Sequence, residues 1–183
     1  MAPTRLHIVP GDGEGRARQA EDLLRTAARQ QEAVAHLGQQ ALAGVPTPSL
    51  LDTAAGLVTR GLEVEFSEVL EFQPERRSLI LRAGTGWRDG RLGRVVETAE
   101  ASGLAGYTLA APGPVVIDDA PGETRFEVPR MLRDHGIASG IAVVIHGKER
   151  PFGVLGAYTA RRREFTTPEV LFVQAVAHVL ATS

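Results

Sequence analysis

The sequence predicts an α+β domain built on an antiparallel sheet. Three observations support this: helical periodicity near both ends of the chain, period-two alternation between them, and polar turns that join most of the alternating segments. Strands joined by hairpins, with helices grouped at the ends, are typical of an antiparallel sheet. We therefore expect one such sheet rather than a parallel α/β arrangement.

The N-terminal part of the chain predicts a long helix after a flexible segment. Residues 1–15 end in alternating glycines and predict a flexible lead-in, whereas residues 16–43 contain no proline and consist mostly of good helix formers. Within the helix, spacings of four and three alternate as in a heptad repeat. The repeat consists of Leu23, Ala27, Gln30, Val34, Leu37 and Ala41. It predicts a dimer seam; the alternative is an amphipathic helix lying on its own domain.

Residues 44–48 stop this helix. The segment that follows predicts a second helix and then a hairpin. The second helix begins at Thr47 or Ser49. Alternation over residues 64–72 predicts a strand with one apolar and one solvated face, and the turn at 73–77 leads into a partner strand at 79–83. The apolar face carries Val64, Phe66, Leu70 and Phe72, and the solvated face carries Glu65, Ser67 and Glu71.

The second half of the chain predicts three more strands and two more helices. Residues 84–113 are rich in glycine and read as irregular, a strand follows at 115–117, and a short helix is expected within 126–135. Strands at 141–145 and 152–159 form a second hairpin. Thr166 and Glu169 have capping-box spacing and predict the start of a last helix. That helix meets no stop signal before residue 183, which predicts that it is truncated.

The composition excludes several function classes. A net charge of −2 gives no electrostatic reason to expect nucleic acid or an acidic membrane as a partner. The absence of cysteine removes disulfides, thiolate metal sites and cysteine nucleophiles. The five histidines lack metal-ligand spacing, and no apolar run could span a bilayer or form a signal peptide. We expect a cytoplasmic protein without a metal site.

Several ordered segments resemble the GAF domain family. They are residues 106–109, 114–119 and 123–126 in the middle of the chain, the two strands at 135–145 and 151–159, and the closing segment at 163–177. The resemblance covers residues 35–182. It implies a five- or six-stranded antiparallel sheet with the terminal helices on one face and a ligand pocket on the other. It divides the chain into a signalling or dimerisation helix at 16–43 and a GAF domain at 44–183.

The implied pocket gives a set of candidate ligand-binding residues. Tyr107 and Trp87 each combine an apolar ring with one polar group, so they could line a pocket or pack in the core. The acidic pair that ends the third strand could accept hydrogen bonds from a ligand or cap the next turn. The complete set is Trp87, Tyr107, Asp118, Asp119, Arg125, Phe126, His135 and Ser139.

The ligand itself is not identified by the sequence. Photoreceptor GAF domains attach a bilin through a cysteine, so a covalent bilin is excluded. The Asn-Lys-x-x-x-Phe-x-x-x-Asp/Glu signature of cyclic-nucleotide-binding GAF domains is absent. His135 could ligate haem iron, as in haem-binding members of the family, although a histidine at a helix end is the simpler interpretation.

We therefore expect a regulatory sensory domain without catalytic residues of its own. The resemblance is to modules of bacterial sensor histidine kinases and diguanylate cyclases, in which terminal helices form homodimers that relay signals to an output domain. Two alternatives remain, a structural dimerisation spacer with an empty pocket and a haem-based gas or redox sensor. A methionine sulfoxide reductase is excluded, because that chemistry uses cysteines.

Overall fold

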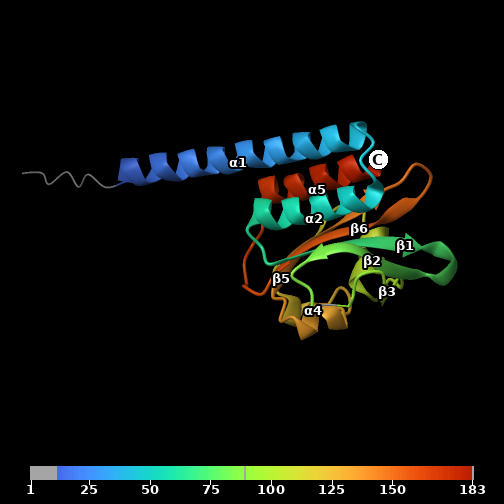
Figure 1. Cartoon of the computed structure of the whole chain (residues 1–183). Coiled ribbons are helices and arrows are strands. Elements are labelled where there is room, and N and C mark those ends of the chain that lie inside the picture. Colours follow the sequence, from blue (N-terminus) through green and yellow to red (C-terminus); the bar gives the residue numbers. More distant parts are fainter. Residues whose placement is uncertain (1–11, 89, 183) are drawn as a thin grey trace, which may run out of the picture.

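The computed structural model describes residues 12–88 and 90–182, so most of the predicted lead-in lies outside the described residues. The elements follow in the order α1 (Asp12–Leu42), α2 (Thr47–Leu62), β1 (Phe66–Gln73), β2 (Ser78–Thr85), β3 (Val95–Thr98), α3 (Leu104–Ala110), β4 (Val115–Ile117), α4 (Arg130–Asp134), β5 (Ser139–His146), β6 (Pro151–Thr159) and α5 (Thr167–Ala181) (Figure 1). Short 3-10 turns at Pro74–Arg76 and Ala120–Gly122 complete them.

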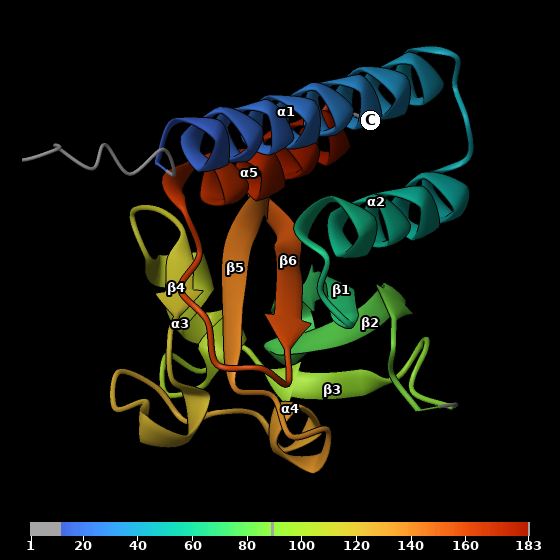
Figure 2. The same cartoon turned by 90° about the vertical axis from the view of Figure 1, so that its left-hand side faces the viewer.

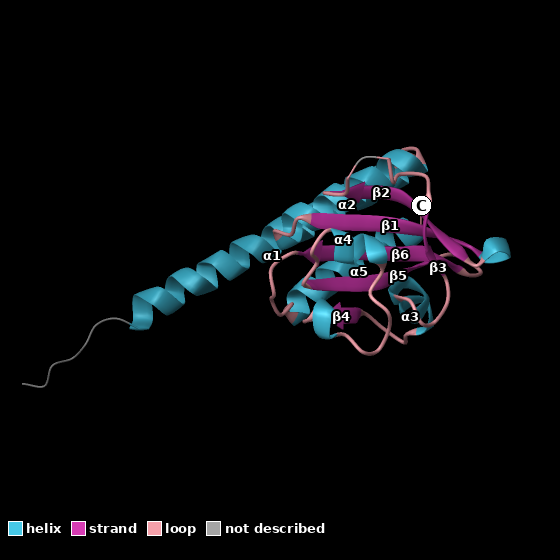
Figure 3. Ribbon diagram, turned by 90° about the horizontal axis from the view of Figure 1, so that it is seen from below, coloured by secondary structure: helices cyan, strands magenta, loops and turns pink. Residues whose placement is uncertain are grey.

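The sheet confirms the predicted fold class. Its six strands lie in the order β3-β2-β1-β6-β5-β4, and all neighbours are antiparallel. The two predicted hairpins, β1–β2 and β5–β6, supply four of the strands, and β1 joins them by pairing with β6 (Figure 3). The centre of the sheet is therefore formed by strands that are distant in the sequence.

Two layers cover the sheet. Helices α1, α2 and α5 lie over one face, here called the helix face, while α3, α4 and the connecting loops cover the other, the distal face (Figures 1 and 2). Each side has its own apolar core: Leu50, Val58 and Val173 belong to the helix-face core, and Leu81 and Leu104 to the distal core. The terminal helices do pack on one face, as the family resemblance implied.

The predicted solvated face of the first hairpin is wrong at its centre. Ser67 and Val69 of β1 are fully buried, because α2 packs on that side and the Ser67 hydroxyl donates a 2.9 Å hydrogen bond to the Ala55 carbonyl oxygen. Glu71 of the same face is only half-buried and forms an ion pair with Arg82. Glu65 of the same predicted face is exposed, so α2 shields only the middle of this face from water.

Helix α1 has two different halves. Its residues from 15 to 29 are exposed, whereas Gln30 donates a 2.8 Å hydrogen bond to the Gly61 carbonyl oxygen and Leu37 is fully buried against α2 and α5. Val34 and Ala41 also pack on the helix-face core, while Leu23 and Ala27 do not. Four of the six heptad residues are thus used within the chain itself, as in the alternative interpretation, and the dimer stays a prediction.

The glycine-rich middle is more ordered than the sequence indicates. Residues 84–113 contain both β3, which pairs with β2 at the sheet edge, and α3, which packs on β5 and β6. Both elements are short, and α3 lies close against the segment that precedes it, because a Cβ at Gly106 would clash with the Glu100 carbonyl oxygen. Tertiary packing, not local periodicity, therefore determines these elements.

The predicted start of the last helix agrees with the structure, whereas the predicted start of the first helix does not. The Glu169 carboxylate accepts hydrogen bonds from the Thr166 backbone N–H and hydroxyl, at 2.8 and 3.0 Å, which confirms the start of α5. Helix α1 begins at Asp12, so the flexible assignment is wrong for residues 12–15. Glycine costs only about 1 kcal/mol in a helix, too little to stop a long one. None of the described helices combines the length and apolarity needed to cross a bilayer.

We expect Leu37→Ala to lower the free energy of unfolding by about 2–4 kcal/mol, because it opens a cavity beneath α1. Leu42→Ala, in the same helix but 92% exposed, serves as the control and should change the value by less than about 0.5 kcal/mol. Urea unfolding followed by circular dichroism measures both. Equal effects of the two substitutions would show that α1 is not part of the folded core.

Candidate functional site

A buried carboxylate lies at the centre of the distal face. Glu68 of β1 is 2% exposed, and the Tyr158 hydroxyl of β6 donates a 2.8 Å hydrogen bond to its Oε1 atom. The Oε2 atom is equally buried and has no hydrogen-bond partner among the described residues. Buried polar atoms without a partner are rare in folded proteins, which makes Glu68 a candidate functional residue.

Two glycines make room for the Tyr158 ring. In the sheet register, Gly140 of β5 lies opposite Tyr158, and Gly156 of β6 lies opposite Glu68. A Cβ at Gly140 would lie 2.3 Å from the Tyr158 ring, and a Cβ at Gly156 would lie 2.3 Å from the hydroxyl. Tyr158 can therefore lie flat across β6 and reach the carboxylate of the next strand only because both positions lack side chains.

A second carboxylate lies near Glu68. Glu97 of β3 is half-buried, and its Oε1 atom accepts a 2.8 Å hydrogen bond from the Ala105 N–H of α3. Burial raises the pKa of Glu97 to about 7, partly offset by that hydrogen bond. Burial also raises the pKa of Glu68 to about 8, the Tyr158 hydrogen bond opposes this shift, and the charge of Glu97 adds to it. The two carboxyl groups thus favour protonated forms near neutral pH.

Two of the sequence-predicted residues meet beside this acid pair. The Trp87 indole N–H donates a 2.6 Å hydrogen bond to the Ser67 carbonyl oxygen, and the ring lies 5.1 Å from His135 and 6.1 Å from Tyr158, centroid to centroid. Phe66 contacts both Trp87 and His135. These aromatic side chains form a wall along the edge of the distal core.

His135 serves as a helix-end residue. It caps the C-terminus of α4, its Nδ1 atom lies 2.7 Å from the Met131 carbonyl oxygen, and its Nε2 atom accepts a 3.3 Å hydrogen bond from the Arg88 backbone N–H. Both ring nitrogens are therefore engaged by backbone groups. Ligation of haem iron would require breaking one of these bonds.

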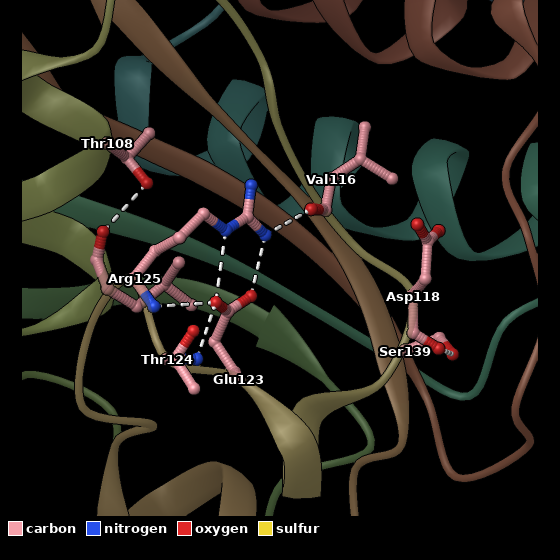
Figure 4. A network of polar contacts seen from close by, with 8 residues as sticks. Thr108, Val116, Asp118, Glu123, Thr124, Arg125 and Ser139 are labelled. Carbon is pink, nitrogen blue, oxygen red and sulfur yellow. Dashed lines mark hydrogen bonds and ion pairs between the residues drawn. The ribbon is translucent and has the colours of Figure 1, made fainter.

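Three other predicted residues form a separate group near β4. Tyr107 and Phe126 pack with ring centroids 5.2 Å apart, and the Arg125 guanidinium lies 5.5 Å from the Phe126 centroid. Arg125 also donates to the Val116 carbonyl oxygen at 2.7 Å and to the Glu123 carboxylate at 2.6 Å (Figure 4). Hydrogen bonds from Arg125 lower the pKa of Glu123 to about 2. The ion pair lies within the loop, and the hydrogen bond to the Val116 carbonyl oxygen ties this loop to β4.

The remaining predicted residues connect β4 and β5 to the arginine-rich turn. Asp118 is exposed, and its carbonyl oxygen accepts a 2.9 Å hydrogen bond from the buried Ser139 hydroxyl, which itself accepts one from the Arg163 N–H at 3.0 Å. Asp119 forms a 3.2 Å ion pair with Arg162. The Ser139 hydroxyl is thus engaged within the fold. The arginine-rich turn, residues 161–163, is thus anchored to its neighbours, although Arg161 and Arg162 are exposed.

The acid pair and Tyr158 are not among the residues predicted from the sequence. A signal was present for Glu68: it stands between Phe66 and Leu70 at the period-two spacing of the apolar face, where a charged residue is out of place. No comparable signal marks Glu97, because β3 itself was not recognised. Tyr158 reads as an ordinary residue of a buried strand, and only the register with β1 brings it to Glu68.

The distal face combines a few polar groups with apolar rings. Within residues 12–88 and 90–182, no three His, Asp or Glu side chains gather closely enough to hold a metal ion. Glu68 and Tyr158 are buried within the distal core, and the aromatic wall lies at its edge. A few polar groups within an apolar lining are typical of small-molecule sites.

Comparison with known proteins identifies relatives of the fold. The sequence profile of the GAF domain family matches residues 41–183. A GAF domain of a phosphoenolpyruvate-protein phosphotransferase from Coxiella burnetii superposes with a TM-score of 0.74 at 17% identity, covering 85% of this chain and 92% of that one. Its Acinetobacter counterpart gives 0.70 at 18%, covering 83% and 90%. Free methionine-R-sulfoxide reductase from Neisseria meningitidis gives 0.71 at 17%, covering 97% and 93%. A comparison with curated sequences returns no significant match.

We expect Glu68→Gln to weaken the pH dependence of stability. Because the pKa of Glu68 rises from 4.5 to about 8 on folding, the folded state holds a proton between these pH values that the unfolded state has released. The free energy of unfolding therefore falls as the pH rises through this window and levels off above it. Glutamine carries no titrating proton and still accepts the Tyr158 hydrogen bond, so only the smaller contribution of Glu97 should remain.

Urea unfolding at several pH values from about 5 to 8 measures this slope. Glu75→Gln, an exposed carboxylate in the β1–β2 turn, is the control and should keep the wild-type slope. If Glu68→Gln also kept it, the Glu68 carboxyl could not be the group that holds the proton.

Proposed function

Because this chain belongs to the GAF domain family, we propose that it is a cytoplasmic regulatory sensory domain that binds a small molecule on its distal face. It passes the signal through α1 and α5 to an output domain of the sensor histidine kinase or diguanylate cyclase type. The observation that carries the proposal is the arrangement of the two layers. A binding-type cluster lies on one face of the sheet, signalling helices lie on the other, and the same strands contact both.

A short path connects the two faces at Ser67. Its hydroxyl bonds to α2 on the helix face, its carbonyl oxygen accepts the Trp87 indole N–H from the distal face, and the next residue in the chain is Glu68. A ligand that moves Glu68 or Trp87 must therefore also move the residue that α2 rests on. Allosteric coupling requires such an element, which both sites contact.

A second path runs through the arginine-rich turn. Arg162 pairs with Asp119 on the distal side. Arg163 forms an ion pair with Glu169 in the first turn of α5 and donates a 3.1 Å hydrogen bond to the Leu62 carbonyl oxygen at the end of α2. Displacement of the β4 loop would consequently act on the start of α5 and the end of α2 together.

The helix face offers an apolar surface for a homodimer. A groove of about 450 Å³ runs between α1 and α5, and its apolar lining includes Ala27, Val34 and Leu171. Leu171 is 57% exposed, and Leu23, one helical turn beyond Ala27, is 65% exposed. Exposed leucines on adjacent helices are typical of helical dimer interfaces, because their burial removes apolar area from water. We propose that the exposed half of α1 pairs with α1 and α5 of a second copy.

We expect Leu171→Glu and Leu23→Glu to convert a homodimer into a monomer, because each places a charge within the apolar interface. Leu92→Glu, at an exposed leucine of the β2–β3 connection, should leave the dimer intact. Light scattering coupled to size-exclusion chromatography measures the mass. A monomeric wild-type protein at high concentration, or a Leu171→Glu protein that remains dimeric, would contradict the proposed interface.

Ligand binding is tested separately by native mass spectrometry. We expect the gently desolvated protein to carry a small molecule that is lost at higher collision energy. Alternatively, a metabolite panel should include a compound that raises the melting temperature, because ligands of the folded state stabilise it. If neither a bound molecule nor a stabilising metabolite is found, the domain serves as a structural spacer instead.

A further inference from the structure

Three arginine side chains converge on Asp134 at the C-terminal end of α4. Its carboxylate Oδ2 atom lies 3.5 Å from Nε of Arg130 and 3.7 Å from Nη2 of Arg91, and its carbonyl oxygen accepts a 3.4 Å hydrogen bond from Nη2 of Arg88. This group, here called the Asp134 cluster, therefore has three positive charges for one negative charge. The excess is notable in a chain whose net charge is −2.

The β2–β3 connection brings two of these arginines to α4. Gly90 and Gly93 have φ angles of 85° and 74°, a region that favours glycine, and they let the chain turn on either side of Arg91. The backbone N–H of Arg88 donates a 3.3 Å hydrogen bond to the Nε2 atom of His135. The connection is thus attached to the end of α4 through both its backbone and its side chains.

The fold alone does not account for the Asp134 cluster. The side chains of Arg130 and Asp134 are 84% and 35% exposed, and solvated ion pairs longer than a hydrogen bond contribute little to stability. Cations are favourable near the C-terminus of a helix, but α4 has only five residues and therefore a small dipole. Because like charges repel, three neighbouring guanidinium groups favour a further anion beside them.

Two exposed apolar side chains accompany these charges. Leu92 follows Arg91 directly and is 62% exposed, and Val95 at the start of β3 is 52% exposed. Arginine is enriched in protein interfaces, where apolar side chains also lose their contact with water, whereas nucleic acids are bound through phosphate contacts and stacking on aromatic rings. Residues 88–95 contain three arginines and a single acidic residue, Asp89. The surface therefore fits an acidic protein segment better than a nucleic acid.

The nearby edge of the sheet is poorly suited to pairing with an added strand. β3 is an edge strand of only four residues, and its register with β2 shifts between Leu79 and Ile80. Short and irregular edge strands resist the addition of another chain. A partner at this end of the sheet would therefore bind through side chains.

We propose that residues 88–95 and α4 form a docking surface for an acidic protein segment. Carboxylates of the partner pair with Arg91 and Arg130, because a guanidinium group can bind a carboxylate through two N–H donors. An apolar side chain of the partner contacts Leu92 and Val95. This docking surface is separate from the α1 and α5 surface proposed for the dimer, so its role goes beyond the sensory function.

A peptide of three Glu-Asp-Leu repeats is the probe for this docking surface. Two matched peptides separate its features, since Gln-Asn-Leu repeats lack the charge and Glu-Asp-Gly repeats lack the apolar side chains. A thymidine oligonucleotide of the same net charge tests nucleic acid. Fluorescence anisotropy of each labelled probe at constant ionic strength measures the affinity. We expect the Glu-Asp-Leu peptide to bind at least about tenfold more tightly than the other three, because it alone combines both features.

Removal of two arginines from the docking surface should abolish most of this affinity. We expect the double substitution Arg91→Gln and Arg130→Gln to weaken binding of the Glu-Asp-Leu peptide by about tenfold or more, because it removes the charges that pair with the partner. The matched control removes two exposed charges from the β5–β6 turn, by Lys148→Gln and Arg150→Gln, and should bind as the wild type does.

Asp134→Asn gives a readout that a purely structural role would not produce. It removes the carboxylate that competes with the partner for the arginines, so we expect the Glu-Asp-Leu peptide to bind about threefold or more tightly. Glu149→Gln, at an exposed position in the β5–β6 turn, removes the same charge elsewhere and should leave the affinity unchanged. A cluster that only stabilises the fold would show a lower free energy of unfolding in Asp134→Asn and no gain in affinity.

Several results would overturn the docking surface. They are equal binding of the Glu-Asp-Leu and Gln-Asn-Leu peptides, unchanged affinity in the Arg91→Gln and Arg130→Gln double variant, and no binding of any probe at millimolar concentration. Tighter binding of the thymidine oligonucleotide would assign the surface to nucleic acid instead. None of these results bears on small-molecule binding at the distal face, which the native mass spectrum tests independently.

Discussion

Burial of the central strands on both faces is the constraint on which the rest of this structure depends. β1, β6 and β5 lie between the helix-face core and the distal core, so each of their side chains must find apolar or hydrogen-bonded surroundings. This explains Ser67, whose hydroxyl bonds to α2, and the glycines at 140 and 156, which give the Tyr158 ring its space. It also explains why the pKa of the Glu68 carboxyl group on β1 is raised.

The sequence was informative wherever one short segment contained the whole signal. The Thr166–Glu169 capping box, the two hairpins and the long first helix depend on contacts within a few residues or on regular spacing, and all are present. β3 and α3 were missed because each is short and is held by packing rather than by local preference. The first hairpin was assigned a solvated face because alternation alone does not show that α2 covers its polar side.

The candidate site was predictable only in part for the same reason. Trp87 and His135 do meet, and Tyr107, Phe126 and Arg125 form a group of their own, but these two groups are separate and neither contains the buried acid. Glu68, Glu97 and Tyr158 come from three strands that only the sheet order brings together. Their meeting depends on register, which a single sequence does not encode in any local pattern.

The position of Glu68 also connects the two faces of the sheet. Burial raises the pKa of its carboxyl group, so the charged form is disfavoured within the distal core. Ser67 is joined to Glu68 by one peptide bond and to α2 by its hydroxyl, so β1 cannot adjust on one face alone. The strand that separates the distal core from the helices is therefore also the element that connects them.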